Sequence, residues 1–160
     1  FVDRDRQRHQ AHPTVPASTR ARMKIVLDTN VLVAGLLTPT GPPGWIIEAA
    51  LAGDLDLVFN MAICLEYNEV LHRKELDLPA AHVGEVLAAI DKFGFEAVAI
   101  GPWPLPLPDP DDAMFLAVAA ATRCPLVTGN LRHFPARSRG RVEVVSPRQF
   151  ADRFLKDSAR

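Results

Sequence analysis

Residues 24–30 read Lys-Ile-Val-Leu-Asp-Thr-Asn, and this stretch decides the fold that the sequence predicts. Three consecutive aliphatic residues are typical of a short strand buried on both faces, as in a parallel sheet. The strand then ends in polar residues, and a new apolar run begins at Val31. Because ligands of open α/β sheets bind beyond the carboxyl ends of the strands, Asp28 is a candidate site residue. The alternative is that Asp28 belongs to a turn and that Thr29 or Asn30 caps the next helix.

Outward from this strand, apolar segments with strand and helix character alternate along the chain. Further strands are predicted at 55–59, 95–100, 125–128 and 142–145, and helices at 31–37, 45–51, 61–74, 79–93, 111–122 and 147–155. Five prolines between Gly101 and Pro110 predict a stiff extended segment that is neither helix nor central strand. The alternation predicts a three-layer α/β/α sandwich around a central parallel sheet.

The length of 160 residues predicts one domain, which we assign to residues 23–155, followed by a tail at 156–160. Residues 1–22 have no apolar periodicity, and we expect them to be a disordered or non-native extension. Met23 stands directly before the first strand, so we expect it to be the natural start, with the preceding segment a tag, a fusion scar or upstream translation.

The composition is that of a soluble globular protein, with 48% hydrophobic and 23% charged residues. No apolar run approaches the ~20 residues needed to cross a bilayer, so we expect no membrane span. Cys64 and Cys124 are read as small buried side chains in a reducing compartment, which predicts a cytoplasmic protein. The net charge is +3 over residues 1–22 and −4 over residues 23–160, so composition gives no positive evidence for nucleic-acid binding.

A glutamate lies on the apolar side of the helix predicted at 61–74. Glu66 stands three residues after Ile63 and four before Val70, which puts it on their stripe, whereas Glu69 lies nearer the flank. A carboxylate turned toward a core is costly unless it is paired or binds a metal, so Glu66 is a second candidate. Alternatively, Glu66 reaches solvent at the edge of the stripe or pairs with an arginine.

Asp112 repeats this placement in the helix predicted at 111–122. Phe115 and Leu116 follow it on the inward stripe, at i+3 and i+4. The run Asp-Pro-Asp-Asp from position 109 is also a strong helix start, with Asp109 as the N-cap and acids at the positive end of the helix dipole. Asp112 is therefore the third candidate, with capping as its alternative.

Polar side chains also follow the strand predicted at 125–128. Thr128 and Asn130 stand at its carboxyl end, as Asp28 and Asn30 do after the first strand. Because parallel strands bring their carboxyl ends to one edge, we expect a shared site there, made of Asp28, Glu66 and Asp112 with Thr128, Asn130 and Asn30 in support. Such oxygen ligands suit Mg²⁺ or Mn²⁺ rather than zinc. The alternative at Gly129-Asn130 is a simple turn, and His133, without a partner at ligand spacing, is expected to be structural or substrate-facing.

Four motifs, in this order, resemble the PIN-domain ribonuclease family, in particular the toxin components of bacterial toxin–antitoxin pairs. They are Ile-Val-Leu-Asp-Thr-Asn-Val-Leu at 25–32, Glu-Tyr-Asn-Glu-Val-Leu at 66–71, Asp-Pro-Asp-Asp-Ala-Met-Phe-Leu at 109–116 and Val-Thr-Gly-Asn-Leu-Arg-His-Phe at 127–134. The likeness covers about residues 23–150. The resemblance implies a PIN-like fold and a Mg²⁺- or Mn²⁺-dependent endoribonuclease.

Carried over residue by residue, the resemblance implies that Asp28, Glu66 and Asp112 are catalytic acids and metal ligands, with Asp109 a further candidate ligand. The family often has a fourth acid where this chain has Asn130, which predicts weaker metal binding rather than lost activity, since an amide oxygen still coordinates. The expected chemistry is attack by metal-activated water on the scissile phosphate, leaving a 5′-phosphate and a 3′-hydroxyl. Thr128 and Asn130 would orient water or phosphate.

The resemblance also implies partners, namely an RNA substrate and a cognate antitoxin that blocks the site. Exposed apolar surface on the helices at 45–51 and 79–93 would suit antitoxin docking or a homodimer. A basic run could grip the RNA backbone, or could be a solvated loop, and it contains Arg132, Arg137, Arg139 and Arg141.

Other classes fit less well. A dehalogenase-type phosphatase would carry a second aspartate at position 30, where Asn30 stands. A receiver domain would need an acidic pair before Asp28 and a late lysine, and the sequence has neither arrangement. The remaining alternative is a catalytically weak or inactive PIN scaffold that acts as an RNA-binding or interaction module, because Asn130 replaces an acid.

Overall fold

The computed structural model describes residues 22–98 and 100–158. The predicted extension, apart from Arg22, lies outside these residues, as do the last two positions of the predicted tail. Arg22 donates a hydrogen bond to the Gly53 carbonyl (3.1 Å) and lies 3.9 Å from the carboxylate of Asp56. The first described residue is therefore already attached to the body of the protein.

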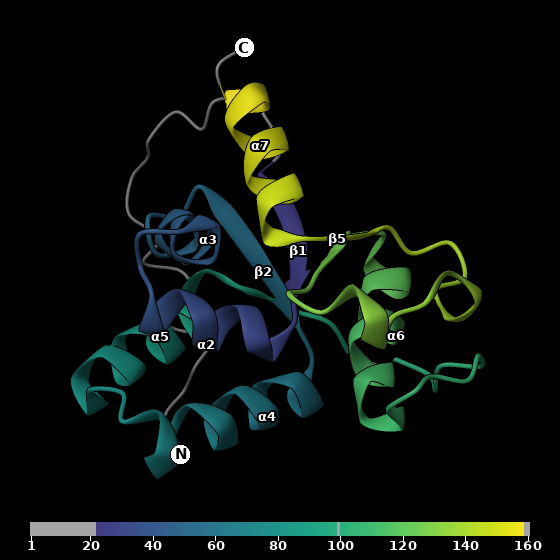
Figure 1. The fold of residues 1–160 in the computed structure, drawn as a ribbon, viewed down its shortest axis with the longest axis horizontal. Helices are drawn as coiled ribbons and strands as arrows, with labels where there is room; N and C mark the ends of the chain where they lie inside the picture. Colours follow the sequence, from purple (N-terminus) through teal and green to yellow (C-terminus); the bar gives the residue numbers. More distant parts are fainter. Residues whose placement is uncertain (1–21, 99, 159–160) are drawn as a thin grey trace, which may run out of the picture.

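A parallel sheet of five strands, in the order β3-β2-β1-β4-β5, forms the centre of the molecule (Figure 1). The strands are β1 (Met23–Leu27), β2 (Leu55–Phe59), β3 (Phe95–Glu96), β4 (Leu126–Val127) and β5 (Val144–Val145). β1 is the middle strand, and its residues Ile25, Val26 and Leu27 are fully buried. The apolar run that predicted a doubly buried strand is thus explained by helices covering both faces.

Helices flank this sheet, which confirms the predicted α/β sandwich. They are α2 (Thr29–Leu37), α3 (Pro42–Leu51), α4 (Met61–Leu71), α5 (Ala80–Phe93), α6 (Ala113–Thr122) and α7 (Pro147–Ser158), with single 3₁₀ turns η1 (Lys74–Leu76), η2 (Pro110–Asp112), η3 (Leu131–His133) and η4 (Ala136–Ser138). α6 packs on β1, β2 and β4, while α3 packs on β2, α2, α5 and α7. Figure 1 shows α6 on one side of the sheet and α2, α3 and α5 on the other. Within the described ranges, no helix is long and apolar enough to cross a bilayer.

Several element boundaries differ from the prediction. Of the strand predicted at 95–100, position 99 lies outside the described residues, and among the others only Phe95–Glu96 forms a strand, because it pairs with the last two residues of β2 and the partner strand then ends. The backbone N–H of Ala97 still donates to the Phe59 carbonyl (2.7 Å), which is the final contact of that ladder. The strands predicted at 125–128 and 142–145 likewise retain two residues each.

Helix ends moved for local backbone reasons. α4 ends at Leu71 rather than at position 74, with His72 as its C-cap. The η1 turn follows and ends at Asp77, which adopts a left-handed conformation (φ 48°). α3 begins at Pro42, where two prolines occupy the first helical turn in a region predicted to be loop. α6 starts at Ala113, preceded by the η2 turn, in which Asp109 accepts a hydrogen bond from the Asp111 N–H (3.0 Å). Asp109, which was predicted to cap the helix at 111–122, therefore caps the η2 turn instead.

Two glycines allow α2 and α3 to cross closely. A Cβ atom at Gly44 would lie 2.0 Å from the Pro39 carbonyl oxygen, and one at Gly35 would lie 2.7 Å from the Pro43 carbonyl oxygen. Backbone atoms cannot move aside as a flexible side chain can. These two glycines therefore fix the connection through which the chain passes from β1 to β2.

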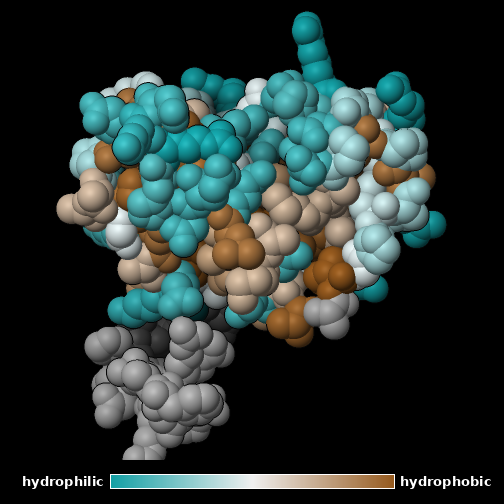
Figure 2. All heavy atoms as spheres, turned by 90° about the horizontal axis from the view of Figure 1, so that it is seen from below, coloured by the Kyte–Doolittle hydropathy of each residue, from teal (hydrophilic) through white to brown (hydrophobic). Residues whose placement is uncertain are grey.

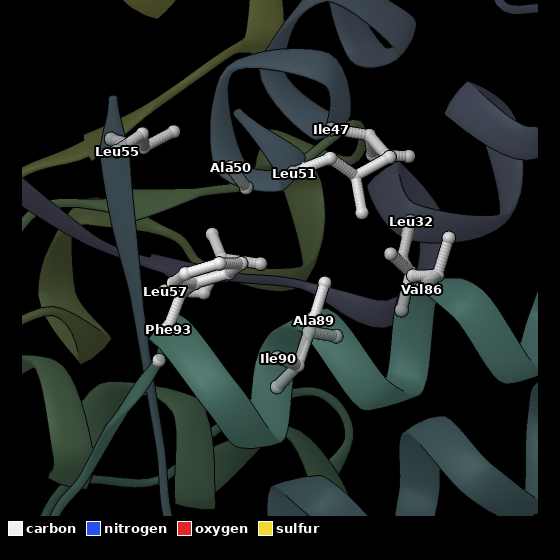
Figure 3. A pocket seen from close by; sticks show the side chains of 11 residues that line it. Leu32, Ile47, Ala50, Leu51, Leu55, Leu57, Val86, Ala89, Ile90 and Phe93 are labelled. Atoms are coloured by element: carbon white, nitrogen blue, oxygen red, sulfur yellow. The ribbon is translucent and has the colours of Figure 1, made fainter. Parts of the chain in front are cut away.

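Neither apolar cavity described in the molecule contains the predicted acids. Figure 3 shows side chains from α2, α3, α5 and β2 converging on a space of about 10 Å³, among them Leu32, Ile47, Leu57 and Val86. That space is hardly larger than one water molecule and its lining is apolar. A larger cavity of about 260 Å³ lies between α3 and α7, next to Trp45. The chemistry predicted from the sequence therefore belongs to a surface edge of the sheet rather than to a closed apolar pocket.

The proline-rich segment before η2 is fastened to the loop around η4. The indole Nε1 of Trp103 donates to the Ser138 carbonyl (2.9 Å), and the buried hydroxyl of Ser138 donates to the Pro106 carbonyl (2.6 Å). Gly140, with φ 57°, lies against the Trp103 ring. The two chain segments that lead into the acidic edge are thus held together.

Candidate active site

Asp28 lies directly after the central strand, as the sequence predicted. It is 5% exposed and occupies the N-cap position of α2, but its side chain makes no capping hydrogen bond. The backbone carbonyl of Asp28 accepts from the N–H of Val31 (3.0 Å), which leaves the carboxylate for other contacts. The hydroxyl of Thr128 donates to Asp28 Oδ2 (2.7 Å) and ties the ends of β1 and β4 together. Because α2 begins at Thr29, neither Thr29 nor Asn30 is its N-cap, and that part of the alternative is wrong.

Glu66 reaches the same edge from α4, where it is partly buried. The hydroxyl of Thr29, in the first turn of α2, donates to Glu66 Oε2. The next residue, Tyr67, is fully buried, and its hydroxyl donates to the Leu27 carbonyl at the end of β1. α4 is therefore attached to the β1–α2 junction at two successive residues. Among the described residues, no arginine forms an ion pair with the carboxylate of Glu66, which accepts from Thr29 instead.

Glu69 separates from the site on the same helix. It is exposed and forms an ion pair with Arg73 one turn later, at 3.1 Å. This exposed position agrees with the prediction that Glu69 lies nearer the flank of the helix than Glu66 does.

Asp112 approaches the site from η2, and its side chain is 14% exposed. Its Oδ2 atom is buried and, among the described residues, accepts no hydrogen bond of good geometry. The imidazole of His133 on η3 lies beside it, with Nδ1 at 3.3 Å from this oxygen. Asp109 is exposed, and its carboxylate is used in the η2 cap.

The predicted supporting residues connect the strand ends through hydrogen bonds. Asn30 Oδ1 accepts from the Gly129 N–H (3.2 Å), and the Asn130 N–H donates to the Thr128 hydroxyl (3.1 Å). Thr128 is fully buried, whereas Asn30 is exposed and Asn130 is partly buried. In this structure these residues shape the loop after β4 instead of presenting all their oxygen atoms to one point.

Burial and mutual repulsion govern the electrostatics of the acids. Burial raises the pKa of Asp28, which the Thr128 hydrogen bond opposes and the charge of Glu66 reinforces. Burial raises the pKa of Asp112 to about 6, with further contributions from the charges of Asp28 and Asp109. The acids are therefore near enough to disfavour one another's ionised forms, and a cation at this edge would relieve that repulsion.

The donor set fits a divalent cation in chemistry and charge. It consists of carboxylate oxygens with neighbouring hydroxyl and amide oxygens, which suits Mg²⁺ or Mn²⁺, and the buried Asp112 Oδ2 accepts no hydrogen bond from the residues that the structure describes. However, in the described part of the chain no three His, Cys, Asp or Glu side chains are gathered closely enough to hold an ion. Oxygens of Asp28 and Glu66 are held by Thr128 and Thr29 instead. The candidate ligands therefore lie at one edge of the sheet, but they do not surround a single cation position.

The predicted basic residues lie in η3, in η4 and just after η4. Arg132 and Arg137 are exposed there, as is Arg141. Arg139 is partly buried, and its Nε donates to the Phe134 carbonyl, so it supports the loop itself. The run is thus divided between a structural arginine and exposed ones.

Sequence reasoning missed three contributors to this site. Thr29 was considered as a cap and Tyr67 was not considered as a site residue, yet both bond across to a different element. His133, expected to be structural or substrate-facing and without a partner at ligand spacing, faces Asp112. The available signal for His133 was its position on the short stretch that follows Asn130, directly after the strand end.

Comparisons with known proteins agree with this architecture. The model of the family described as "PIN domain" matches residues 24–132. A curated relative, an uncharacterized protein (MJ1680) of Methanocaldococcus jannaschii, is 25% identical over 147 residues, covering 86% of this chain and 95% of the relative. The crystal structure of PAE2754 from Pyrobaculum aerophilum aligns with a TM-score of 0.53 at 16% identity, covering 84% of this chain and 90% of that one. At this identity the structural likeness shows a common fold.

Proposed function

Because this chain belongs to the PIN domain family, we propose that it is a metal-dependent endoribonuclease and the toxin of a toxin–antitoxin pair that acts in the cytoplasm. PIN domains are generally nucleases and typically use divalent metal ions, which supports the hydrolase class. Beyond this class, we propose RNA as the substrate, Mg²⁺ or Mn²⁺ as the metal ion and a role as a toxin.

The proposal depends on one observation, namely that acidic side chains from three elements lie at the carboxyl ends of β1 and β4. Asp28 is buried at the strand end, and Glu66 is joined to the same junction through Thr29. Asp112 has a raised pKa and a buried oxygen to which no described residue donates a hydrogen bond. Repulsion among buried carboxylates destabilises the folded chain unless it is relieved. Binding of Mg²⁺ or Mn²⁺ at this site would relieve that repulsion.

In the proposed mechanism Asp28, Glu66 and Asp112 would hold the cation, with Asp109 a possible additional ligand at the exposed margin. A bound Mg²⁺ or Mn²⁺ supplies Lewis-acid stabilisation of phosphate charge and activation of water. Thr128 and Thr29 keep the first two carboxylates in place through their hydroxyl groups. Asn30 and Asn130 hold the loop beside them, and Arg132 and Arg137 would contact the RNA backbone.

Partner binding is proposed on exposed apolar side chains. Met61 and Leu65 on α4 are 62% and 61% exposed, more than Trp45 on α3 (40%) or Phe93 on α5 (37%). Figure 2, which views the molecule from the α4 side, shows a band of apolar atoms between hydrophilic regions. Such surface supports docking of an antitoxin or of a second copy of the chain.

The test is cleavage of a mixed RNA pool by the purified chain with Mn²⁺ or Mg²⁺, compared with the variants Asp28→Asn and Glu66→Gln. We expect both variants to lose activity by about 100-fold or more, the scale on which removal of a charge-stabilising group slows an enzyme. Glu69→Gln on the same helix is the matched control and should cleave normally, since Glu69 pairs with Arg73 at the surface. Cleavage that survives in both site variants would contradict the proposal.

A second candidate function is an RNA-binding or interaction module with weak or no catalysis. Two observations favour it, namely the neutral Asn130 where the family often has an acid and the absence, in the described residues, of three ligands gathered around one point. Absence of cleavage by every form, with the fold intact and RNA still bound, would support this second function.

A further inference from the structure

A chain of hydrogen bonds runs from Asp28 to the residue that faces Asp112. The Thr128 hydroxyl donates to Asp28 Oδ2 (2.7 Å) and accepts from the N–H of Asn130 (3.1 Å). The carbonyl of Asn130 in turn accepts from the N–H of His133 (3.1 Å). The backbone of His133 is therefore attached to Asp28 through three successive bonds.

The far end of this chain is fixed by burial. Phe134, directly after His133, is fully buried, and its carbonyl accepts a hydrogen bond from Arg139 Nε. A residue held between Asn130 and a buried phenylalanine has little freedom to move its backbone. The side chain of His133 can therefore be presented to a defined neighbour.

That neighbour is Asp112. His133 Nδ1 lies 3.3 Å from Asp112 Oδ2, and the two side chains are 45% and 14% exposed. Oδ2 is buried and otherwise without a donor in the described part of the chain, and an ionised carboxylate oxygen in that condition is costly. The distance is slightly long for a hydrogen bond, so a small movement of either side chain would complete it.

We propose that His133 is a positioning residue that holds the Asp112 carboxylate through Nδ1, so that the loop of residues 128–133 sets Asp112 in place relative to Asp28. This inference rests on the proposed function, because the orientation of Asp112 matters through the cation it would bind. Outer-shell hydrogen bonds of this type orient metal-binding side chains in other proteins. The imidazole donates from Nδ1 in this role, which leaves Nε2 without a proton in the neutral ring.

The test uses three substitutions that separate the two ring nitrogens. The amide nitrogen of His133→Asn takes about the place of Nδ1, that of His133→Gln reaches toward Nε2, and His133→Ala removes both. His72→Ala is the control, because His72 is an exposed histidine on the α4 end whose Nδ1 contacts the Asn68 carbonyl. Thermal unfolding of the metal-free proteins checks that every variant is folded.

Two properties are measured for each protein, namely Mn²⁺ affinity by calorimetry without RNA, and kcat and KM for RNA cleavage. We expect His133→Ala and His133→Gln to weaken Mn²⁺ binding or lower kcat by about 10- to 100-fold, with His133→Asn close to wild type and KM little changed. Unchanged Mn²⁺ affinity and kcat in His133→Ala would overturn the inference. Restoration by His133→Gln instead of His133→Asn, or a change in KM alone, would also overturn it, since it would indicate contact with RNA through Nε2.

Failure of the inference and failure of the proposed function give different results. If the wild-type chain binds Mn²⁺ but cuts no RNA, the proposed function fails, and the Mn²⁺ affinities of the variants still decide the role of His133. If the wild-type chain cuts RNA and His133→Ala cuts equally well, the proposed function stands and the inference fails. A wild-type chain that binds no Mn²⁺ overturns both.

Discussion

Asp28 and Asp112 differ in how the fold treats their carboxylates. Asp28 is the more deeply buried, and it receives a hydrogen bond from the Thr128 hydroxyl. Asp112 is less buried, yet its inner oxygen has no comparable donor in the residues described. Because burial without a donor favours the protonated acid, Asp112 is the residue whose ionisation most directly opposes folding in the absence of a cation.

This difference predicts how stability depends on pH in the metal-free protein. Burial, with the charges of Asp28 and Asp109, raises the pKa of folded Asp112 from 3.8 to about 6. In the pH range between those values the folded chain therefore holds more protons than the unfolded chain, so the free energy of unfolding falls as the pH rises from about 4 to about 6. Asp112→Asn should lack this component and gain on the order of 2 kcal/mol at neutral pH.

The measurement is urea denaturation with a chelator present, at several pH values, for the wild type and the variant. The difference between the two curves isolates Asp112 from the other titrating groups. Equal stability of the two proteins at every pH would contradict the inference that the ionised Asp112 carboxylate destabilises the folded protein.

At the residue scale, the sequence predicted the acids but not their partners. Glu66 and Asp112 were found because an acid on an apolar stripe is unusual, and Asp28 because it ends a strand. The bond from Thr29 to Glu66 spans 37 residues and depends on how α4 is oriented over β1. Side-chain spacing along one element carries no information about that orientation, so the Thr29 and His133 contacts could not be predicted.

At the scale of elements, the crossing of α2 and α3 depends on close backbone approach. A Cβ at Gly44 would meet the Pro39 backbone at 2.0 Å, whereas a Cβ at Gly84 in α5 would meet nothing within 4 Å. Both glycines lie in helices, so the gain in helix propensity on substitution by alanine is the same at the two positions. The difference between the two sites is therefore one of packing alone.

These two glycines predict opposite effects of the same substitution. Gly44→Ala should destabilise the protein by at least about 2 kcal/mol, because backbone atoms must shift. Gly84→Ala should stabilise it by up to about 1 kcal/mol, since alanine is the better helix former. Thermal and urea unfolding of the two variants measures both changes, and a neutral Gly44→Ala would show that α3 is free to move.

The order of elements was predictable because segments with strand-like and helix-like apolar patterns are distinct along the chain. Their exact ends were less so, since an end is decided by what lies beside it. β3 ends at Glu96 because β2 offers no partner beyond Phe59, although the apolar pattern continues in the sequence. The 3₁₀ turns η2 and η3, which deliver Asp112 and His133, also depend on the surrounding fold rather than on a local pattern.

At the scale of the whole molecule, charge and proposed substrate do not match. Residues 23–160 carry a net charge of −4, although the proposed ligand is a polyanion. Binding must then depend on local positive charge. The exposed residues Arg132 and Arg137, which follow closely after Asn130 in the sequence, carry such charge. A bound divalent cation would reduce the mismatch at the acids themselves.

The salt dependence of RNA binding tests this distribution of charge. In the Asp28→Asn background, which should not cleave, replacement of both Arg132 and Arg137 by alanine should weaken binding. The slope of log affinity against log salt should fall by about 0.7 for each lost phosphate contact on a single strand. Arg73→Ala is the control, since Arg73 pairs with Glu69 on α4. An unchanged slope in the double variant would assign RNA binding to another face.

The hydrogen bond between Thr128 and Asp28 joins positions that are 100 residues apart in the chain. A ribosome synthesises Asp28 early and Thr128 late, and β4 cannot add to β1 until both exist. During that interval the nascent chain carries its first two acids without the strand, loop and histidine that complete the edge. A protein proposed to cut RNA is therefore without its assembled site during that part of its synthesis.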